Sequence, residues 1–209
     1  MVGEFKDIHG LLQLEDSTEY LAGIMEEQYK HSIALFLHEF KDRKQVYKQE
    51  FMKVIDQVLL KGIEKQENGR KERIAYICIF FLKSSIMTSS YQMQINLYDQ
   101  NLYMDRNDVF TKWDTTFLMK YFENDIAVLN RMAKQRIYHW GYKEYQLLTM
   151  EYVKMYMDLL ELYCADFIRD MLLLESYDRI NKEDTVKVYY GGYLNQLHCI
   201  YPLEVPKEG

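Results

Sequence analysis

The sequence predicts a mainly α fold: a single-domain bundle of five to seven helices with one or two small β-hairpins packed on it. Apolar residues recur at three- and four-residue steps over long stretches, which is the spacing of one helix face. Both prolines, Pro202 and Pro206, lie near the end of the chain, so no proline interrupts an earlier helix. With 209 residues, 48% of them hydrophobic, the chain is long enough to build one core across residues 1–209.

The first half of the chain predicts three long helices. Asp16 and Ser17 offer capping side chains for a helix that we expect to run to about residue 42. A second apolar stripe follows at 47–63 and ends at a polar, glycine-containing turn. The run 74–87 is apolar on nearly all sides, so we expect it to be the central helix of the bundle.

Region 90–104 permits two interpretations. Apolar and polar residues alternate from Tyr91 to Tyr98, which predicts a strand, and a turn at 99–101 would complete a β-hairpin. The alternative is a helical continuation, because helices tolerate glutamine and methionine.

The second half predicts two short helices, at about 114–122 and 124–132, and then a long one. The apolar spacing over 142–178 predicts a helix about 54 Å in length. Beyond it, β-branched and aromatic residues flank Gly191-Gly192, a dipeptide that favours a tight turn. We therefore expect a C-terminal β-hairpin at about 185–201, as an appendage of the helical domain.

The charge balance and the cysteines limit the functional classes. Lys and Arg number 26 against 32 Asp and Glu, for a net charge of -6, so nucleic acid is not an expected partner. No apolar run approaches the length that crosses a bilayer, and the N-terminus has no signal-like apolar segment. The three cysteines are widely spaced and predict neither a disulfide framework nor a zinc site. These features predict a cytoplasmic protein without a membrane partner.

Catalytic motifs are missing from the sequence. It contains no GxGxxG or P-loop glycine pattern, no GxSxG nucleophile turn and no HExxH zinc motif. We therefore expect no cofactor, and we favour a protein that is not an enzyme.

One group of side chains resembles a metal-ligand set. Glu27 and His31 lie four residues apart, and His38 lies seven further on, so the three share one side of a helix over about three turns. Di-iron bundles place Glu and His three residues apart on two helices, and this sequence has no such spacing. The sequence thus predicts no bound metal, with Glu27, His31 and His38 as the alternative site.

Tyrosine is the most distinctive residue type, with 19 copies. Tyrosine combines a large contact area with a polar tip, and it is enriched at protein interfaces. Around the glycine pair, alternation along the strand sends Tyr189 and Tyr190 to opposite faces, one of which would be free to bind a partner. Cys199 and the preceding histidine also face opposite sides, which argues against a Cys-His catalytic pair. The candidate partner-binding residues are Tyr189, Tyr190, Tyr193 and His198.

Two functional hypotheses follow. The first is a non-catalytic protein-interaction protein, for instance an immunity, antitoxin or adaptor protein, whose acidic, tyrosine-bearing surface covers another protein. The second is a helical enzyme, or a small-ligand or metal-binding bundle, that uses Glu, Asp and His side chains from several helices. The sequence leaves homo-oligomers open under either hypothesis.

Overall fold

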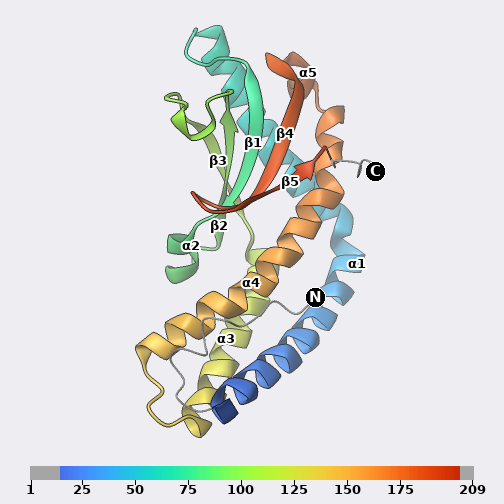
Figure 1. Cartoon of the computed structure of the whole chain (residues 1–209). Helices are drawn as coiled ribbons and strands as arrows, with labels where there is room; N and C mark the ends of the chain where they lie inside the picture. Colours follow the sequence, from blue (N-terminus) through green and yellow to red (C-terminus); the bar gives the residue numbers. More distant parts are fainter. Residues whose placement is uncertain (1–14, 203–209) are drawn as a thin grey trace, which may run out of the picture. The chain divides into compact units, whose positions relative to one another are not determined.

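A computed structural model describes residues 15–202 and shows helices together with a five-stranded mixed sheet (Figure 1). The expected all-α bundle with one or two hairpins is therefore wrong, because the sheet is a major element of the fold. Contacts within the chain group it into two compact units. Unit 1 comprises 15–43 and 117–159, and unit 2 comprises 44–116 and 160–202. A single folding domain across 1–209 stays a prediction.

Three helices contain most of the helical residues: α1 (Glu15–Glu67), α3 (Thr116–Arg136) and α4 (Tyr142–Phe167). Helix α1 is continuous where the sequence predicted an end near residue 42. Its buried residues Phe36 and Tyr47 are about three turns apart, so both apolar stripes follow one face. The two short helices expected around 114–132 are likewise the single helix α3. No helix within 15–202 is apolar over a length that would cross a membrane.

The long helix expected over 142–178 ends earlier, at Phe167. A 3-10 turn, η2 (Ile168–Leu173), and a one-turn helix, α5 (Glu175–Arg179), follow it. Ile168 and Met171 are both fully buried. Their spacing of three matches the repeat of a 3-10 helix, in which such side chains lie one above the other.

The sheet has the order β3-β2-β1-β4-β5 and belongs to unit 2. Strand β1 pairs parallel with β4, and the other neighbouring pairs are antiparallel. The strands are β1 (Ile74–Phe81), β2 (Gln92–Tyr98), β3 (Val109–Asp114), β4 (Lys182–Gly192) and β5 (Leu197–Tyr201).

The expected central helix at 74–87 is instead the central strand β1, followed by the short helix α2 (Lys83–Met87). Ile77 and Ile79 point to one face of the sheet and Cys78 and Phe80 to the other, and all four are fully buried. A strand covered on both faces is apolar on all sides, as a buried helix is, so hydrophobicity alone does not separate the two. The prediction of deep burial was right, and the element type was wrong.

Region 90–104 contains the strand β2, so the helical alternative is wrong. The hairpin expected within the region is not formed, because residues 102–104 make a 3-10 turn, η1 (Leu102–Met104). Strand β2 pairs with β1 and with β3, and β3 follows after η1.

The two strands expected in the tail, β4 and β5, pair antiparallel, and β4 also pairs with β1. The pair is therefore an integral part of the sheet. Gly191 and Gly192 end β4, and the turn lies just beyond them. Gly191 is needed for close approach, since a Cβ there would lie 2.4 Å from the carbonyl oxygen of Gln196.

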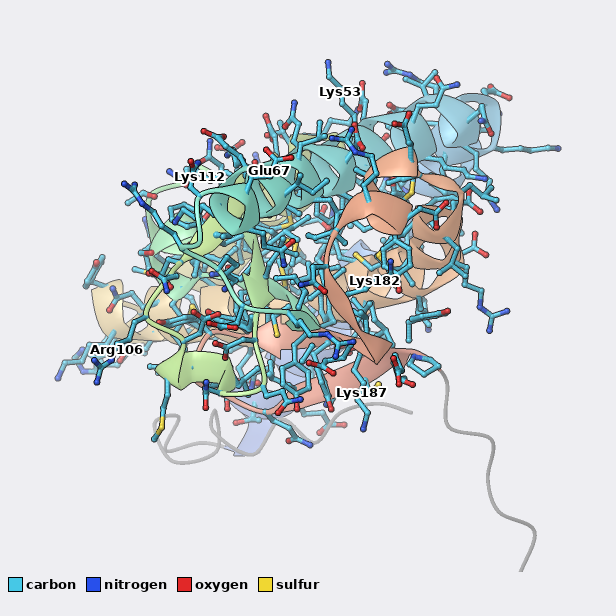
Figure 2. All side chains as sticks on the ribbon, turned by 90° about the horizontal axis from the view of Figure 1, so that it is seen from above. Lys53, Glu67, Arg106, Lys112, Lys182 and Lys187 are labelled. Atoms are coloured by element: carbon cyan, nitrogen blue, oxygen red, sulfur yellow. The ribbon has the colours of Figure 1, made fainter. Side chains whose placement is uncertain are left out.

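The two faces of the sheet pack against different parts of the chain. On the inner face, a Cβ at Gly62 of α1 would lie 2.7 Å from Leu97, and Phe51 of α1 packs against Trp113 with ring centroids 4.7 Å apart. The opposite, outer face contains Cys78 and its register partners Asn96 and Tyr189. Seen from above, Lys187 of β4 projects from the side of the sheet opposite to Lys53 of α1 (Figure 2).

A buried ion pair holds the turn between β2 and β3. The ammonium of Lys71 contacts the Asp105 carboxylate and donates to the carbonyl oxygens of Leu97 (2.9 Å) and Asn107 (3.1 Å). Both charged side chains are almost fully buried. Burial alone would raise the pKa of Asp105, but hydrogen bonds from Lys71 and from two backbone amides outweigh it and lower that pKa.

We expect Lys71→Met to lower the free energy of unfolding by about 3 kcal/mol near neutral pH, because the buried Asp105 carboxylate loses its cation. Since the folded-state pKa of Asp105 is depressed, its contribution is present above about pH 4 and is lost as pH falls through the folded pKa. The difference between variant and wild type should therefore shrink in acid. Urea denaturation across pH measures both effects. Lys61→Met, at an exposed lysine of α1, is the control and should change stability little; equal effects of the two variants would contradict the assignment.

Candidate functional site

Aromatic side chains cover the outer face of the sheet. Phe80 stands at the centre, with Tyr103 of η1 stacked on it at a centroid distance of 6.0 Å and Tyr193 edge-on at 5.4 Å. Tyr103 and Tyr193 also meet each other at 5.9 Å. We call Phe80, Tyr98, Tyr103 and Tyr193 the aromatic cluster. It joins the β2–β3 turn to the β4–β5 turn across the sheet, and such ring pairs stabilise beyond their buried area.

The two joined turns present apolar side chains outward. Met104, next to Tyr103, is 83% exposed, and Leu194, next to Tyr193, is 68% exposed. Tyr193 itself is 49% exposed. We call Met104, Tyr193 and Leu194 the turn surface. The aromatic cluster packs beneath both turns, and the Lys71 ion pair holds the β2–β3 turn.

The outer face of the sheet contains buried polar groups. Within 15–202, the buried side-chain oxygen of Asn96 has no hydrogen-bond partner. Burial raises the pKa of Tyr98 and of Tyr103, so both phenols stay protonated at neutral pH. The cluster is therefore an uncharged aromatic layer.

The structure separates the four residues predicted to bind a partner. Tyr190 is buried on the inner face, and Tyr189 is half-buried on the outer face beside Tyr76, at a centroid distance of 5.9 Å. Tyr193 belongs to the turn surface. His198 is exposed on β5, with its Nδ1 3.1 Å from the carboxylate of Glu161. Of the four residues, Tyr193 is thus the one that belongs to the turn surface. A role in partner binding stays a prediction for each of the four.

The alternative metal-ligand residues do not form a ligand set. Glu27, His31 and His38 are all exposed on α1. Among the residues whose side chains are described, no group of three His, Cys, Asp or Glu side chains is placed to hold a metal ion. The absence of a bound metal stays a prediction, which elemental analysis of the purified protein would test.

A buried carboxylate occupies the centre of unit 1. Asp125 of α3 is fully buried, and it accepts hydrogen bonds from four uncharged donors. Oδ1 accepts from Gln28 Nε2 at 2.8 Å and Ser32 Oγ at 2.5 Å, and Oδ2 accepts from the hydroxyls of Tyr152 and Tyr156, each at 2.6 Å. Burial, and then the bond to Asp125, raise the pKa of both tyrosines. These bonds tie α1, α3 and α4 together within unit 1.

Sequence reasoning missed this cluster because each member had a simpler explanation. Asp125 resembled a helix cap, and Tyr152 and Tyr156 belonged to a long row of tyrosines. A signal was present, since Asp125 falls between the apolar residues Phe122 and Leu129 on one stripe of α3, and the two tyrosines are four residues apart. A carboxylate on a core stripe needs buried donors.

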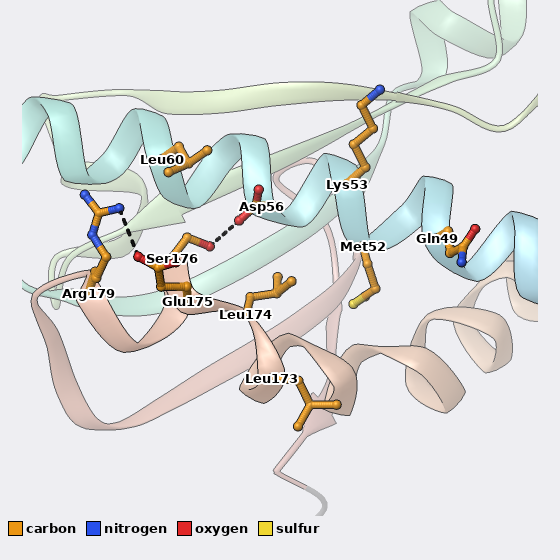
Figure 3. Close-up of a pocket in the computed structure, with 10 residues that line it drawn as sticks. All are labelled: Gln49, Met52, Lys53, Asp56, Leu60, Leu173, Leu174, Glu175, Ser176 and Arg179. Carbon is orange, nitrogen blue, oxygen red and sulfur yellow. Dashed lines mark hydrogen bonds and ion pairs between the residues drawn. The ribbon is translucent and has the colours of Figure 1, made fainter.

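A shallow groove of about 530 Å³ lies in unit 2 between α1 and the segment 173–179 (Figure 3). Met52, Leu60 and Leu174 provide its apolar lining. Its charged groups are largely engaged with neighbours, because Asp56 accepts from Ser176 and Arg179 lies 3.6 Å from Glu175. The groove can accept apolar atoms, with Lys53 as a charged group at its border.

Comparison with known proteins finds no match to this chain among protein-family models, curated proteins or solved structures.

Proposed function

We propose that this chain is a non-catalytic protein-interaction protein that binds another protein through the turn surface. The observation that carries the proposal is the exposure of Met104, Tyr193 and Leu194 on two turns that are joined by the aromatic cluster. Tyrosine and methionine are enriched in protein interfaces, and rigid anchors lose little conformational entropy on binding.

The proposal agrees with the chemistry around the turn surface. Its aromatic layer is uncharged, and an apolar contact region rimmed by polar residues is typical of protein–protein contacts. We infer a cytoplasmic location as well: Cys78, Cys164 and Cys199 are all free thiols, as expected in a reducing compartment.

Two substitutions test the turn surface while leaving the aromatic cluster intact. Met104→Gln keeps the side-chain length, and Leu194→Asn suits the positive φ of +56° at that position. We expect the double variant to keep the wild-type melting temperature. It should recover its partner from native lysate at least about tenfold less well, because each interface anchor is worth about 2 kcal/mol. Quantitative mass spectrometry of the captured proteins measures the change.

The matched control replaces two exposed aromatic residues of unit 1, Tyr138→Gln and Tyr142→Gln. This control should capture the same proteins as the wild type. That result would show that lost capture by the double variant comes from the turn surface and not from a general loss of exposed apolar or aromatic area. Equal recovery of every captured protein by wild type, double variant and control would count against the turn surface as an interface.

A ligand-binding function has one feature in its favour, the groove lined by Met52, Leu60 and Leu174. Its volume falls within the range of small-molecule sites. We rank it second, because its acidic groups are already bonded to neighbouring side chains. Thermal-shift screening of wild type against Leu60→Glu would identify a ligand of the groove.

A further inference from the structure

The two edge strands of the sheet differ in how their outward backbone groups are occupied. At one edge, Lys61 of α1 donates to the carbonyl oxygen of Phe110 at 3.2 Å, and Lys65 donates to that of Asp108. Phe110 lies in β3, and Asp108 immediately precedes the strand. Lysines that cover an edge in this way prevent another strand from pairing there. Strand β3 is therefore a protected edge.

Strand β5, at the other edge, has no lysine bonded to its backbone within the described residues, although it is short and its pairing with β4 is irregular at Ile200. Its backbone pairs there with β4 alone, and its sequence Leu-His-Cys-Ile-Tyr contains no Lys, Arg, Asp or Glu. His198 interacts with Glu161 of α4 through its side chain. An edge strand without charged side chains presents a row of outward N–H and C=O groups to which another extended strand can add.

We propose that β5 pairs antiparallel with β5 of a second copy of this chain, so that the two five-stranded sheets become one continuous sheet. With all of Leu197–Tyr201 paired, Cys199 lies opposite Cys199 of the second copy. Leu197 then lies opposite Tyr201 of the second copy, an apolar–aromatic pair that occurs twice by symmetry. Because β5 contains no Lys, Arg, Asp or Glu, this self-pairing places no two of these charged side chains opposite each other.

One short strand pair buries little surface. Interfaces below about 1,200 Å² form weak, transient complexes, so the dimer should appear as concentration rises from about 10 to about 500 μM. Light scattering coupled to size-exclusion chromatography measures the mass over this range. A monomer at every concentration would overturn the proposal.

The cysteine at the centre of β5 provides a direct test of the pairing. Cys78 and Cys164 are fully buried, so Cys199 is the thiol available for crosslinking in the native protein. Opposed residues of an antiparallel pair have Cα atoms about 4.5 or 5.5 Å apart, and both distances fall within the range of disulfides. Mild oxidation should therefore give a covalent dimer that reduction reverses and that Cys199→Ser abolishes. A dimer in solution whose Cys199 thiols never crosslink would contradict this register.

A charge substitution at the same position completes the test. Cys199→Lys places two ammonium groups opposite each other across the two-fold axis, whereas Cys199→Ser places two neutral hydroxyls there. We expect the serine variant to dimerise as the wild type does and the lysine variant to stay monomeric, with melting temperatures of the dilute proteins matching that of the wild type. Equal dimerisation of the lysine variant would overturn the proposal. Should the lysine variant fail to fold, crosslinking of the wild type decides.

Discussion

Replacing Asp125 with Ala is expected to lower the free energy of unfolding by about 5 kcal/mol, since four buried donors lose their acceptor at once. Each unsatisfied buried donor costs roughly 1–3 kcal/mol, and the Asp125 side chain is 0% exposed. Urea denaturation followed by circular dichroism measures the loss. An Asp125→Ala protein with near-wild-type stability would show that the donors find other acceptors.

The matched control for this experiment lies one residue away. Asn124 is exposed on α3, and Asn124→Ala should change the unfolding free energy by less than about 0.5 kcal/mol. A second comparison isolates the hydrogen bonds. Adding Tyr152→Phe and Tyr156→Phe to Asp125→Ala removes two orphaned hydroxyls, so we expect the triple variant to be more stable than Asp125→Ala alone.

Ile79→Asp is expected to prevent folding of unit 2. Ile79 lies on the central strand β1, is fully buried on the inner face, and pairs with Ile95 and Tyr190 on the neighbouring strands. A carboxylate there would have no cation and no route to water, a cost of several kcal/mol that approaches the whole stability of a domain. Loss of a cooperative thermal transition and of near-ultraviolet circular dichroism would report the effect.

A strand residue on the outer face serves as the control for Ile79→Asp. Phe110 of β3 is 42% exposed, so Phe110→Asp introduces the same charge in place of an apolar side chain near water. We expect a loss of about 1 kcal/mol or less. Similar damage from both substitutions would mean that the outer face of β3 is as closely packed as the inner face.

Helices α1 and α3 were predicted as helical, although the sequence divided each of them into two, and both have one face exposed to water. In α1 and α3, apolar residues at three- and four-residue steps alternate with exposed polar ones, and this pattern is specific to a helix. Strand β1 has no such contrast, because Cys78 and Phe80 are buried on the outer face by turns that lie elsewhere in the chain. Residues elsewhere in the chain bury both faces of β1, so the local sequence pattern of β1 does not reveal which residues cover it.

The candidate site was predicted in part. Alternation along β4 correctly sent Tyr189 and Tyr190 to opposite faces, and the glycine pair located the nearby turn that carries Tyr193. Met104 was missed, because its exposure depends on Lys71 and Asp105 holding the β2–β3 turn in position. Tyr103 was missed for the same reason: its contact with Tyr193 joins two segments that only the sheet brings together.

The parallel pairing of β1 with β4 also governs the order in which the sheet can form during synthesis. The central strand β1 is made well before β4, because α3, α4 and α5 lie between them in the sequence. Until β4 arrives, one edge of the very apolar β1 stays open, which is the condition under which nascent chains aggregate. We therefore expect chains truncated before Lys182 to be captured by chaperones or to precipitate. The sheet should be completed only after β4 has been made, with a rate limited by this long-range contact.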